Sequence, residues 1–293
     1  MPNRLTAGES VFSLANTILM LMLCFVTLYP FLYVLFSSLS DPTLLAQSRG
    51  LLFKPLGFST AAYSAVFDNP MIGKGYQNTL LYVSVGTALN LFMTGLGAYV
   101  LSRKNVLFGN FIMFAIVITM VFSGGLIPSY IVVTKLGMLN TPLAIIVPGL
   151  INTFNMIIMR TAFQSVPVSL EESARMDGAN DFTILFRVIV PLSMPVIAVM
   201  VLWYAVGHWN SYFSALIYLR DRELYPLQLI LREILITNST DNMMTGTSMG
   251  DKMPIGETIK YATIIVSTLP ILCLYPFLQK YFVKGVMIGA IKE

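Results

Sequence analysis

Charged side chains that could form ion pairs and helix caps gather in one short polar segment, 166–182, in the middle of an otherwise apolar chain. Ser169 and Glu172 have the spacing of a capping box, in which the hydroxyl caps a helix and the carboxylate reaches back to the first backbone N–H. Glu171 and Arg175 are four residues apart and can pair on the exposed face of that helix. The segment therefore predicts a short, water-exposed helix whose chemistry is ion pairing.

A glycine divides this polar segment into two halves. Gly178 lies where a left-handed cap would end the first helix, and Asn180 or Asp181 can cap a second helix that begins near Phe182. Together these signals predict a helix–glycine–helix elbow over residues 166–187. An ordinary capped loop is the simpler interpretation of the same pattern. We identify no catalytic residue and no metal site.

The elements around the elbow are apolar enough to lie in a membrane. Hydrophobic residues are 56% of the chain and charged residues only 11%, whereas a soluble domain has roughly 25% charged residues. A bilayer is crossed by about 20 apolar residues in a helix. We predict an all-α membrane protein, residues 1–293 forming a single transmembrane domain with the elbow between its fourth and fifth spans. The six predicted spans are 11–39, 75–102, 105–134, 136–159, 188–219 and 261–279.

Two general features add little to this prediction. Cys24 and Cys273 both lie inside predicted spans, where a cysteine behaves as a small apolar residue, so they imply no disulfide or metal framework. If both termini and the elbow lie on one side, nine basic residues face each side of the membrane. Arg103 and Lys104, in a short turn, weakly favour the cytoplasm for the termini.

The predicted spans lack the residues that drive transport in many carriers. His208 is the only ionisable side chain deep inside a trimmed span, whereas ion-driven carriers keep carboxylates or lysines within their helices. The chain also has no GxxxxGK[ST] phosphate loop. If the chain transports a solute, the energy therefore comes through a partner protein.

The elbow carries a family resemblance. Glu172-Ser173-Ala174, three residues, Gly178, nine residues and then Val188-Ile189-Val190-Pro191 resembles the EAA motif of the membrane subunits of binding-protein-dependent ABC importers. The family pattern is EAA, three residues, G, nine residues and I-x-L-P. Ser173, Val188 and Val190 depart from it by small or apolar exchanges, and the spacing is fully kept.

The resemblance extends over nearly the whole chain and indicates a branch of the family. Segments 124–155, 204–219 and 275–293 resemble the oligosaccharide permeases, and among these the MalG-like subunits of maltose importers. Permeases for plant- or algal-derived oligosaccharides, including the second permease subunit of alginate importers, are more similar still.

The resemblance implies a function for the elbow. In this family the elbow lies in the cytoplasm and inserts into a cleft of the ATPase subunit, so that ATP-driven closure of two ATPases turns the permease outward. The implied partners are a second related permease, two ATPase subunits, an extracytoplasmic solute-binding protein, a carbohydrate substrate and the lipid bilayer, without nucleic acid. The implied location is the cytoplasmic (inner) membrane, with both termini cytoplasmic. ATP and Mg²⁺ would be bound by the ATPases, and this chain would bind no cofactor. The implied coupling residues are Glu171, Glu172, Ser173, Ala174, Arg175, Met176, Asp177, Gly178 and Ala179.

A sugar path needs aromatic faces for the rings and amides for the hydroxyl groups. His208, Trp209 and Asn210 supply these groups within one predicted span, with Tyr212 close by. Asn152 and Asn155 add amides from the preceding span. Ordinary packing is a strong alternative, because aromatic residues commonly fill cores and asparagines commonly join membrane helices.

Three further segments lie outside the predicted spans. We expect residues 220–257 to form a long outward loop; the resemblance implies that it contacts the binding protein, and a disordered linker is the alternative. For the tail from Gln279 the resemblance implies a contact with the ATPases, and a positively charged membrane anchor is the alternative. The stretch "FSTAAYSAVFDNP" within 40–74 predicts a short packed helix. A stand-alone secondary carrier or facilitator, and a membrane scaffold without transport, remain the alternative functions.

Overall fold

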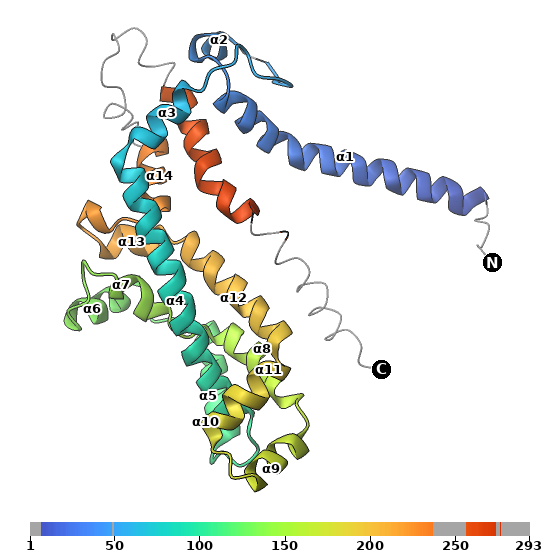
Figure 1. The fold of residues 1–293 in the computed structure, drawn as a ribbon, viewed down its shortest axis with the longest axis vertical. Coiled ribbons are helices and arrows are strands. Elements are labelled where there is room, and N and C mark those ends of the chain that lie inside the picture. The colour runs from blue at the N-terminus through green and yellow to red at the C-terminus, as the bar shows by residue number, and fades with distance from the viewer. Residues whose placement is uncertain (1–6, 49, 237–255, 274–275, 277–293) are drawn as a thin grey trace. The chain divides into compact units, whose positions relative to one another are not determined.

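The computed structural model describes residues 7–48, 50–236, 256–273 and 276. These residues are mainly helical (Figure 1), and their one β-type contact is an isolated antiparallel bridge between Ser40 and Phe58. In chain order the helices are α1 (Ala7–Ser38), α2 (Pro42–Gln47), α3 (Ala61–Asp68), α4 (Pro70–Ser102), α5 (Gly109–Val121), α6 (Leu126–Lys135), α7 (Leu143–Ile146), η1 (Val147–Gly149), α8 (Thr153–Gln164), α9 (Val168–Met176), α10 (Asp181–Ile184), η2 (Leu185–Ile189, a π-turn), α11 (Val190–Leu192), α12 (Met194–Trp209), α13 (Phe213–Tyr218), η3 (Arg222–Leu224) and α14 (Leu227–Ile236). A further helix covers 256–273.

Several of these helices have the length and apolarity to cross a bilayer. Gly8–Ser38 and Pro70–Ser102 do so individually, and three bent helix pairs pass the same test when each pair is taken together. The described residues therefore contain two candidate spans, or five if each pair is one span. This composition is that of an all-α membrane protein.

Three of the predicted spans are not continuous helices. Residues 105–134 form α5 and α6, which meet at 112°, and residues 136–159 lie mostly in two helices that meet at 52°. The helices on either side of residue 193 meet at 89°. Each of these three predicted spans is therefore interrupted in the structure, and its role as one span stays a prediction.

Glycine and proline account for the three breaks. Gly125 has φ +84°, which no right-handed helix accommodates, and it separates α5 from α6. Pro148 and Gly149 shorten α7 to a single turn followed by a 3₁₀ turn. Pro191 and Pro195 lack the N–H that a continuous helix requires, and they flank the bend at residue 193. Average apolarity concealed these local signals.

The chain divides into two compact units, of which the first comprises residues 1–70 and 233–268. In this unit Asp41 caps α2 by accepting hydrogen bonds from two backbone N–H groups. The hydroxyls of Ser38 and Tyr63 lie 2.7 Å apart and join the end of α1 to α3. Val66 is fully buried in α3, which confirms the packed helix predicted in this segment.

The second unit, residues 71–232 and 269–293, is organised along α4. Near the start of α4, the amide of Asn78 donates to the carbonyls of Glu223 and Tyr225, at 2.7 and 3.0 Å. Thr79 accepts a hydrogen bond from the N–H of Leu227 at 2.9 Å. The C-terminal half of α4 lies beside α8 and α12, and α9 lies beyond the ends of these helices (Figure 1). These contacts show that the start of the predicted 220–257 loop is held against α4 and contains helical turns; that the segment faces outward stays a prediction.

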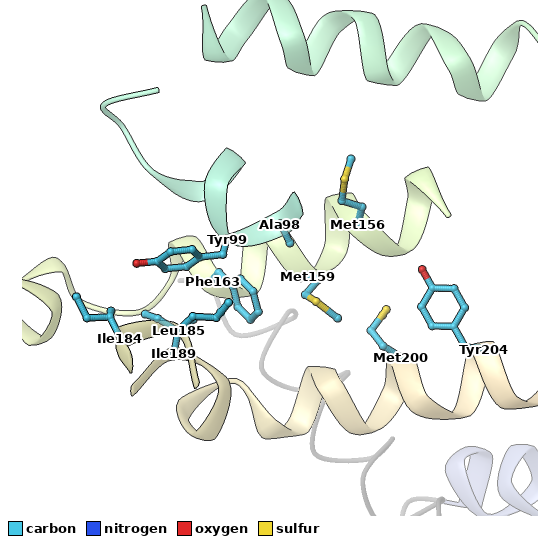
Figure 2. Close-up of a cluster of buried hydrophobic side chains, with 10 residues drawn as sticks. All are labelled: Ala98, Tyr99, Met156, Met159, Phe163, Ile184, Leu185, Ile189, Met200 and Tyr204. Atoms are coloured by element: carbon cyan, nitrogen blue, oxygen red, sulfur yellow. The ribbon is translucent and has the colours of Figure 1, made fainter. Parts of the chain in front are cut away.

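A large hydrophobic cluster lies at the end of this unit next to the elbow turn. Figure 2 shows ten side chains from α4, α8, α12 and the α10–η2 segment converging there. Phe163, Ile184 and Met200 are almost completely buried. The cluster joins α10, the second helix of the elbow, and the π-turn after it to α4, α8 and α12. Its members are Ala98, Tyr99, Met156, Met159, Phe163, Ile184, Leu185, Ile189, Met200 and Tyr204.

Candidate coupling site and solute path

The first helix of the elbow begins two residues earlier than predicted. Pro167 occupies the N-cap position and makes no side-chain cap, so α9 starts at Val168. Ser169 therefore lies inside the helix, where its carbonyl accepts a hydrogen bond from the Ser173 hydroxyl at 2.9 Å. The predicted capping box of Ser169 and Glu172 is not formed. The extended backbone that proline favours at position 167 (φ −57°, ψ 129°) sets the start of the helix instead.

The end of α9 follows the sequence prediction closely. Gly178 has φ +82°, and its N–H donates to the carbonyl of Arg175 at 3.0 Å. The N–H of Ala179 donates to the carbonyl of Ala174 at 2.9 Å. These two bonds form a Schellman motif, which ends a helix sharply and satisfies its last carbonyls.

The second half of the elbow also begins with a well-defined helix cap. The side chain of Asn180 accepts the N–H of Thr183 at 2.8 Å and caps α10, as predicted. The chain then continues through the π-turn Leu185–Ile189 toward α12. Ile184, Leu185 and Ile189 are buried in the cluster of Figure 2, so α10 and the π-turn are packed against α4, α8 and α12.

Buried and half-exposed charges hold α9 against the end of α4. The Glu171 carboxylate forms ion pairs with Arg103 and, at 3.2 Å, with Arg175. Arg175 also contacts Asp181 at 2.6 Å, across the Gly178 turn. The predicted pair of Glu171 and Arg175 is present, but Glu171 is only 7% exposed and does not lie on the exposed face. The carboxylate instead connects two cations from different elements.

Arg103 is the link between the elbow and the membrane helices. Its guanidinium lies 4.8 Å from the ring centroid of Tyr99 and donates to the carbonyl of Phe163 at 3.4 Å. Burial lowers the pKa of Arg103, although an arginine with so high an ordinary pKa stays charged at neutral pH. One cation thus binds α4, α8 and α9 together.

The two faces of α9 differ in what they contact. Ala174 and Ala179 pack against the hydrophobic cluster of Figure 2, next to the buried Glu171. Glu172 and Asp177 are exposed, and Met176 is 88% exposed. The segment therefore has one face packed on the rest of the chain and one exposed face, which carries Glu172, Met176 and Asp177.

The ion pairs of Glu171 include Arg103, which the sequence indicated only as a positive charge that favours the cytoplasmic side. Arg103 is far from Glu171 in the chain, and no local spacing connects them. Tyr99, whose hydroxyl lies 3.5 Å from an Asp181 carboxylate oxygen, was not singled out. The one available signal was the presence of Arg103 immediately after a span, where a cation needs an anionic partner or water.

The predicted solute path contains a polar contact within the helices. Nε2 of His208 lies 2.6 Å from Oδ1 of Asn90, and the Asn90 amide donates to the carbonyls of Gly149 and Leu150 at 2.6 and 2.8 Å. Gly86 makes room for the imidazole, because a Cβ there would lie 2.5 Å from Nε2. Asn90, which sequence reasoning missed, thus satisfies carbonyls freed by the break before α8.

The predicted path residues Trp209, Asn210 and Tyr212 lie at and just beyond the C-terminal end of α12. Trp209 is buried, packs edge-on against Tyr76 with ring centroids 6.2 Å apart, and its Nε1 has no hydrogen-bond partner among the described residues. Asn210 ends α12, so this predicted span is interrupted here. Asn210 and Tyr212 are exposed. A path role for Trp209, Asn210 and Tyr212 stays a prediction.

The two other predicted amides have local tasks. Asn152 caps α8 by accepting the N–H of Asn155 at 3.1 Å, and Asn155 itself is buried. The hydroxyl of Tyr204 lies 2.7 Å from that of Thr94 and accepts the N–H of Asn152 at 3.3 Å. These hydrogen bonds stabilise the break before α8. That Asn152 and Asn155 line a solute path stays a prediction.

An exposed aromatic pair was not anticipated. Phe154 and Trp203 stack with ring centroids 5.7 Å apart and an angle of 23° between their planes, and they are 51% and 37% exposed. Such faces suit the apolar side of a sugar ring or the packing of another helix. No three His, Cys, Asp or Glu side chains of the described residues come together as a metal site.

The chain belongs to the family described as the binding-protein-dependent transport system inner membrane component, which matches residues 6–288. This membership confirms the resemblance carried by the elbow. Transport permeases of this family are membrane subunits and not enzymes, and the family places the chain in the inner membrane.

Individual relatives are similar over nearly their whole length. The chain is 41% identical to "Polygalacturonan/rhamnogalacturonan transport system permease protein YtcP" of Bacillus subtilis (strain 168), over 93% of this chain and 95% of the relative. It is 40% identical to "Protein LplC" of the same organism, over 98% and 97%. A crystal structure of a bacterial ABC transporter involved in the import of the acidic polysaccharide alginate contains a chain with a TM-score of 0.87 and 32% identity, over 95% of this chain and 99% of that one.

Proposed function

We propose that this chain is one of two permease subunits of an ATP-driven importer that moves a carbohydrate across the cytoplasmic membrane. The complex would contain a second related permease, two ATPase subunits and an extracytoplasmic solute-binding protein. The observation that carries the proposal is the elbow, which is attached through Glu171 to the end of α4 and presents the exposed residues Glu172, Met176 and Asp177. A surface of this kind suits a partner that pushes on the membrane helices.

The geometry supports a mechanism in which the elbow moves as one body. Closure of the ATPases displaces α9, and the ion pairs of Glu171 and Arg103 oppose sliding of α9 along α4. The displacement then reaches α12 through the π-turn, whose side chains are packed in the hydrophobic cluster. Because packed cores are not continuously deformable, such a push favours a switch between two arrangements of the helices.

Six spans follow if every helical segment of sufficient length is counted. Two single helices and three bent pairs give five, and the helix 256–273 would be the sixth. An even number of spans would place both termini and the elbow on the same side of the membrane, which we propose to be the cytoplasm. ATP and Mg²⁺ would be bound only by the ATPase subunits, since this chain carries no phosphate-binding loop.

The relatives favour an acidic oligosaccharide as the substrate. One similar permease is named for polygalacturonan and rhamnogalacturonan, and the similar structure belongs to an importer of acidic alginate. The path candidates of this chain are amides and aromatic rings, with His208 as their one ionisable member. This subunit would therefore contact hydroxyl groups and ring faces, and the charge of the sugar would be recognised by the binding protein or the second permease.

The test is uptake by proteoliposomes that contain the chain with its natural partners. Oligogalacturonate and alginate fragments should be taken up only with ATP and binding protein, whereas neutral maltooligosaccharides should not. Vesicles with this chain alone should show neither uptake nor ATP hydrolysis. Sugar uptake by the chain alone would instead identify a facilitator, and ATP hydrolysis by the chain alone would contradict the proposed division of tasks.

A further inference from the structure

A cavity of about 590 Å³ opens at the end of α4, beside the turn that leads to α5. Its walls come from the last residues of α4, the first residues of α5 and the final turns of α8, including Arg103, Lys104 and Arg160. This volume is in the range of cavities that hold small molecules. The cavity is separate from the outward face of α9.

The cavity is strongly basic. Three cations line it, and no carboxylate does. Arg103 is already neutralised by Glu171, but Lys104 and Arg160 form no ion pair with any described residue. Arg160 is held in place because its Nε donates to the carbonyl of Leu101 at 2.7 Å. Two cations are therefore available to a bound anion, and Asn110 adds an amide.

Apolar side chains surround the entrance to this basic cavity. Leu107, Phe108 and Phe111 are 83%, 78% and 70% exposed, and the last two also line the cavity. Phe108 has φ +56°, a left-handed backbone conformation that is unfavourable for a bulky residue. The turn thus keeps a large ring at the surface at a conformational cost. Strained backbone of this kind is concentrated at binding sites.

The location of the cavity at the end of a candidate membrane-spanning helix indicates which kind of anion it would bind. The cavity lies at the end of α4, a helix long and apolar enough to cross a bilayer. In such a span its cations would lie near the lipid headgroups, and the exposed side chains of Leu107 and Phe108 would reach the acyl chains. A soluble anion would gain nothing from such an apolar entrance. Basic pockets between membrane helices on the cytoplasmic side are suited to anionic headgroups.

We propose that this cavity binds the phosphate-bearing headgroup of an anionic phospholipid. Lys104 and Arg160 neutralise the phosphate, Asn110 donates to headgroup oxygens, and the acyl chains lie along Leu107, Phe108 and Phe111. A bound lipid next to Arg103 would also stiffen the end of α4 to which the elbow is attached.

The test uses the assembled permease complex in detergent and counts bound lipids by native mass spectrometry. The probe is phosphatidylglycerol, with phosphatidylcholine as the neutral lipid and glycerol phosphate as the soluble phosphate competitor. The variants are Lys104→Gln, Lys104→Arg and the double variant Lys104→Gln/Arg160→Gln. Lys135→Gln removes an exposed cation at the end of α6, far along the chain from this cavity, and is the matched control. Equal thermal unfolding temperatures show that the variants fold.

The expected result is a binding site for phosphatidylglycerol that weakens about fivefold in Lys104→Gln and about 25-fold in the double variant. Lys104→Arg and Lys135→Gln should bind as the unaltered chain does. Equal binding in all variants would overturn the proposal, and so would equal affinity for phosphatidylcholine. Displacement of the lipid by glycerol phosphate at similar concentration would assign the cavity to a soluble phosphate. Loss of ATPase subunits from Lys104→Gln with lipid binding unchanged would assign it to a protein contact.

Discussion

Replacement of Glu171 should detach the elbow from the membrane helices without removing its partner-facing surface. The carboxylate side chain is 9% exposed and that of Arg103 is 19% exposed, so both charges lie largely out of water. Breaking a buried pair from one side costs about 3–5 kcal/mol. Arg103 keeps the ring of Tyr99 and the carbonyl of Phe163, so we expect the lower end, about 3 kcal/mol, for Glu171→Ala.

The expected loss of stability depends on which residue of the ion pair is replaced and on the residue that replaces it. Glu171→Gln retains a hydrogen-bond acceptor and loses the charge, so we expect about 2 kcal/mol. Arg103→Met should cost less than Glu171→Ala, because Glu171 keeps Arg175 at 3.2 Å as a partner. Glu172→Gln, on the exposed face of the same helix, is the matched control and should leave the attachment intact.

Hydrogen exchange of two backbone amides reports local opening of the elbow turn, which we expect to become easier once α9 is detached from α4. The N–H groups of Gly178 and Ala179 are bonded to carbonyls of α9, and a loss of about 3 kcal/mol corresponds to roughly 100-fold faster exchange through local opening. Sugar taken up per ATP hydrolysed should fall in the same variants, with the amount of permease in the membrane unchanged. In Glu172→Gln the exchange should stay slow while ATPase binding weakens.

One pair of measurements would refute this reasoning. If Glu171→Gln and Glu172→Gln give equal exchange rates at Gly178 and equal transport per ATP, the buried ion pair does not attach the elbow. A double variant, Glu171→Gln with Arg103→Met, adds a second criterion. Its effect should be smaller than the sum of the two single effects, because it leaves no unpaired buried charge.

Further predictions concern the elbow turn and the solute path. Gly178→Val should be strained at φ +82° and should lower ATPase retention or transport per ATP while the permease stays in the membrane; wild-type values for all three quantities would contradict the elbow's role. Gly86→Ala would place a Cβ 2.5 Å from His208, so we expect a loss of about 1–3 kcal/mol in thermal unfolding, which Gly73→Ala, where a Cβ meets nothing, should not cause. Trp209→Ala or Asn210→Ala should lower uptake partially, since a stacked ring face contributes about 0.5–1.5 kcal/mol; unchanged uptake and sugar preference in both would reject their place in the path. Predictions on residues 237–255 and on the tail from Gln279 lie outside the described residues.

Local features of the sequence were sufficient for the class of protein and for the elbow turn. The apolar runs predict membrane helices because hydrophobicity is additive along a chain and needs no knowledge of the fold. Gly178 and Asn180 were predicted correctly since a left-handed cap and a side-chain cap involve residues at most five apart. The EAA-like spacing is local in the same sense.

The same local reasoning failed where two signals competed. Gly125, Pro148 and Pro191 were all visible in the sequence, but long apolar runs around them favoured continuous spans. Ser169 met the rule for a capping box, and Pro167 determined the start of α9 instead. In each case a single backbone conformation outweighed a pattern averaged over several residues.

Only the tertiary structure decided which distant residues meet. Arg103 and Glu171 are far apart in the chain, as are Asn90 and His208, and each pair joins different helices. Sequence spacing carries no information on such pairs, because their distance depends on how helices pack. Whether a side chain is buried also depends on how the helices pack. Glu171 and Glu172 are adjacent and chemically identical, yet packing against α4 makes the first an internal ion-pair partner and leaves the second exposed.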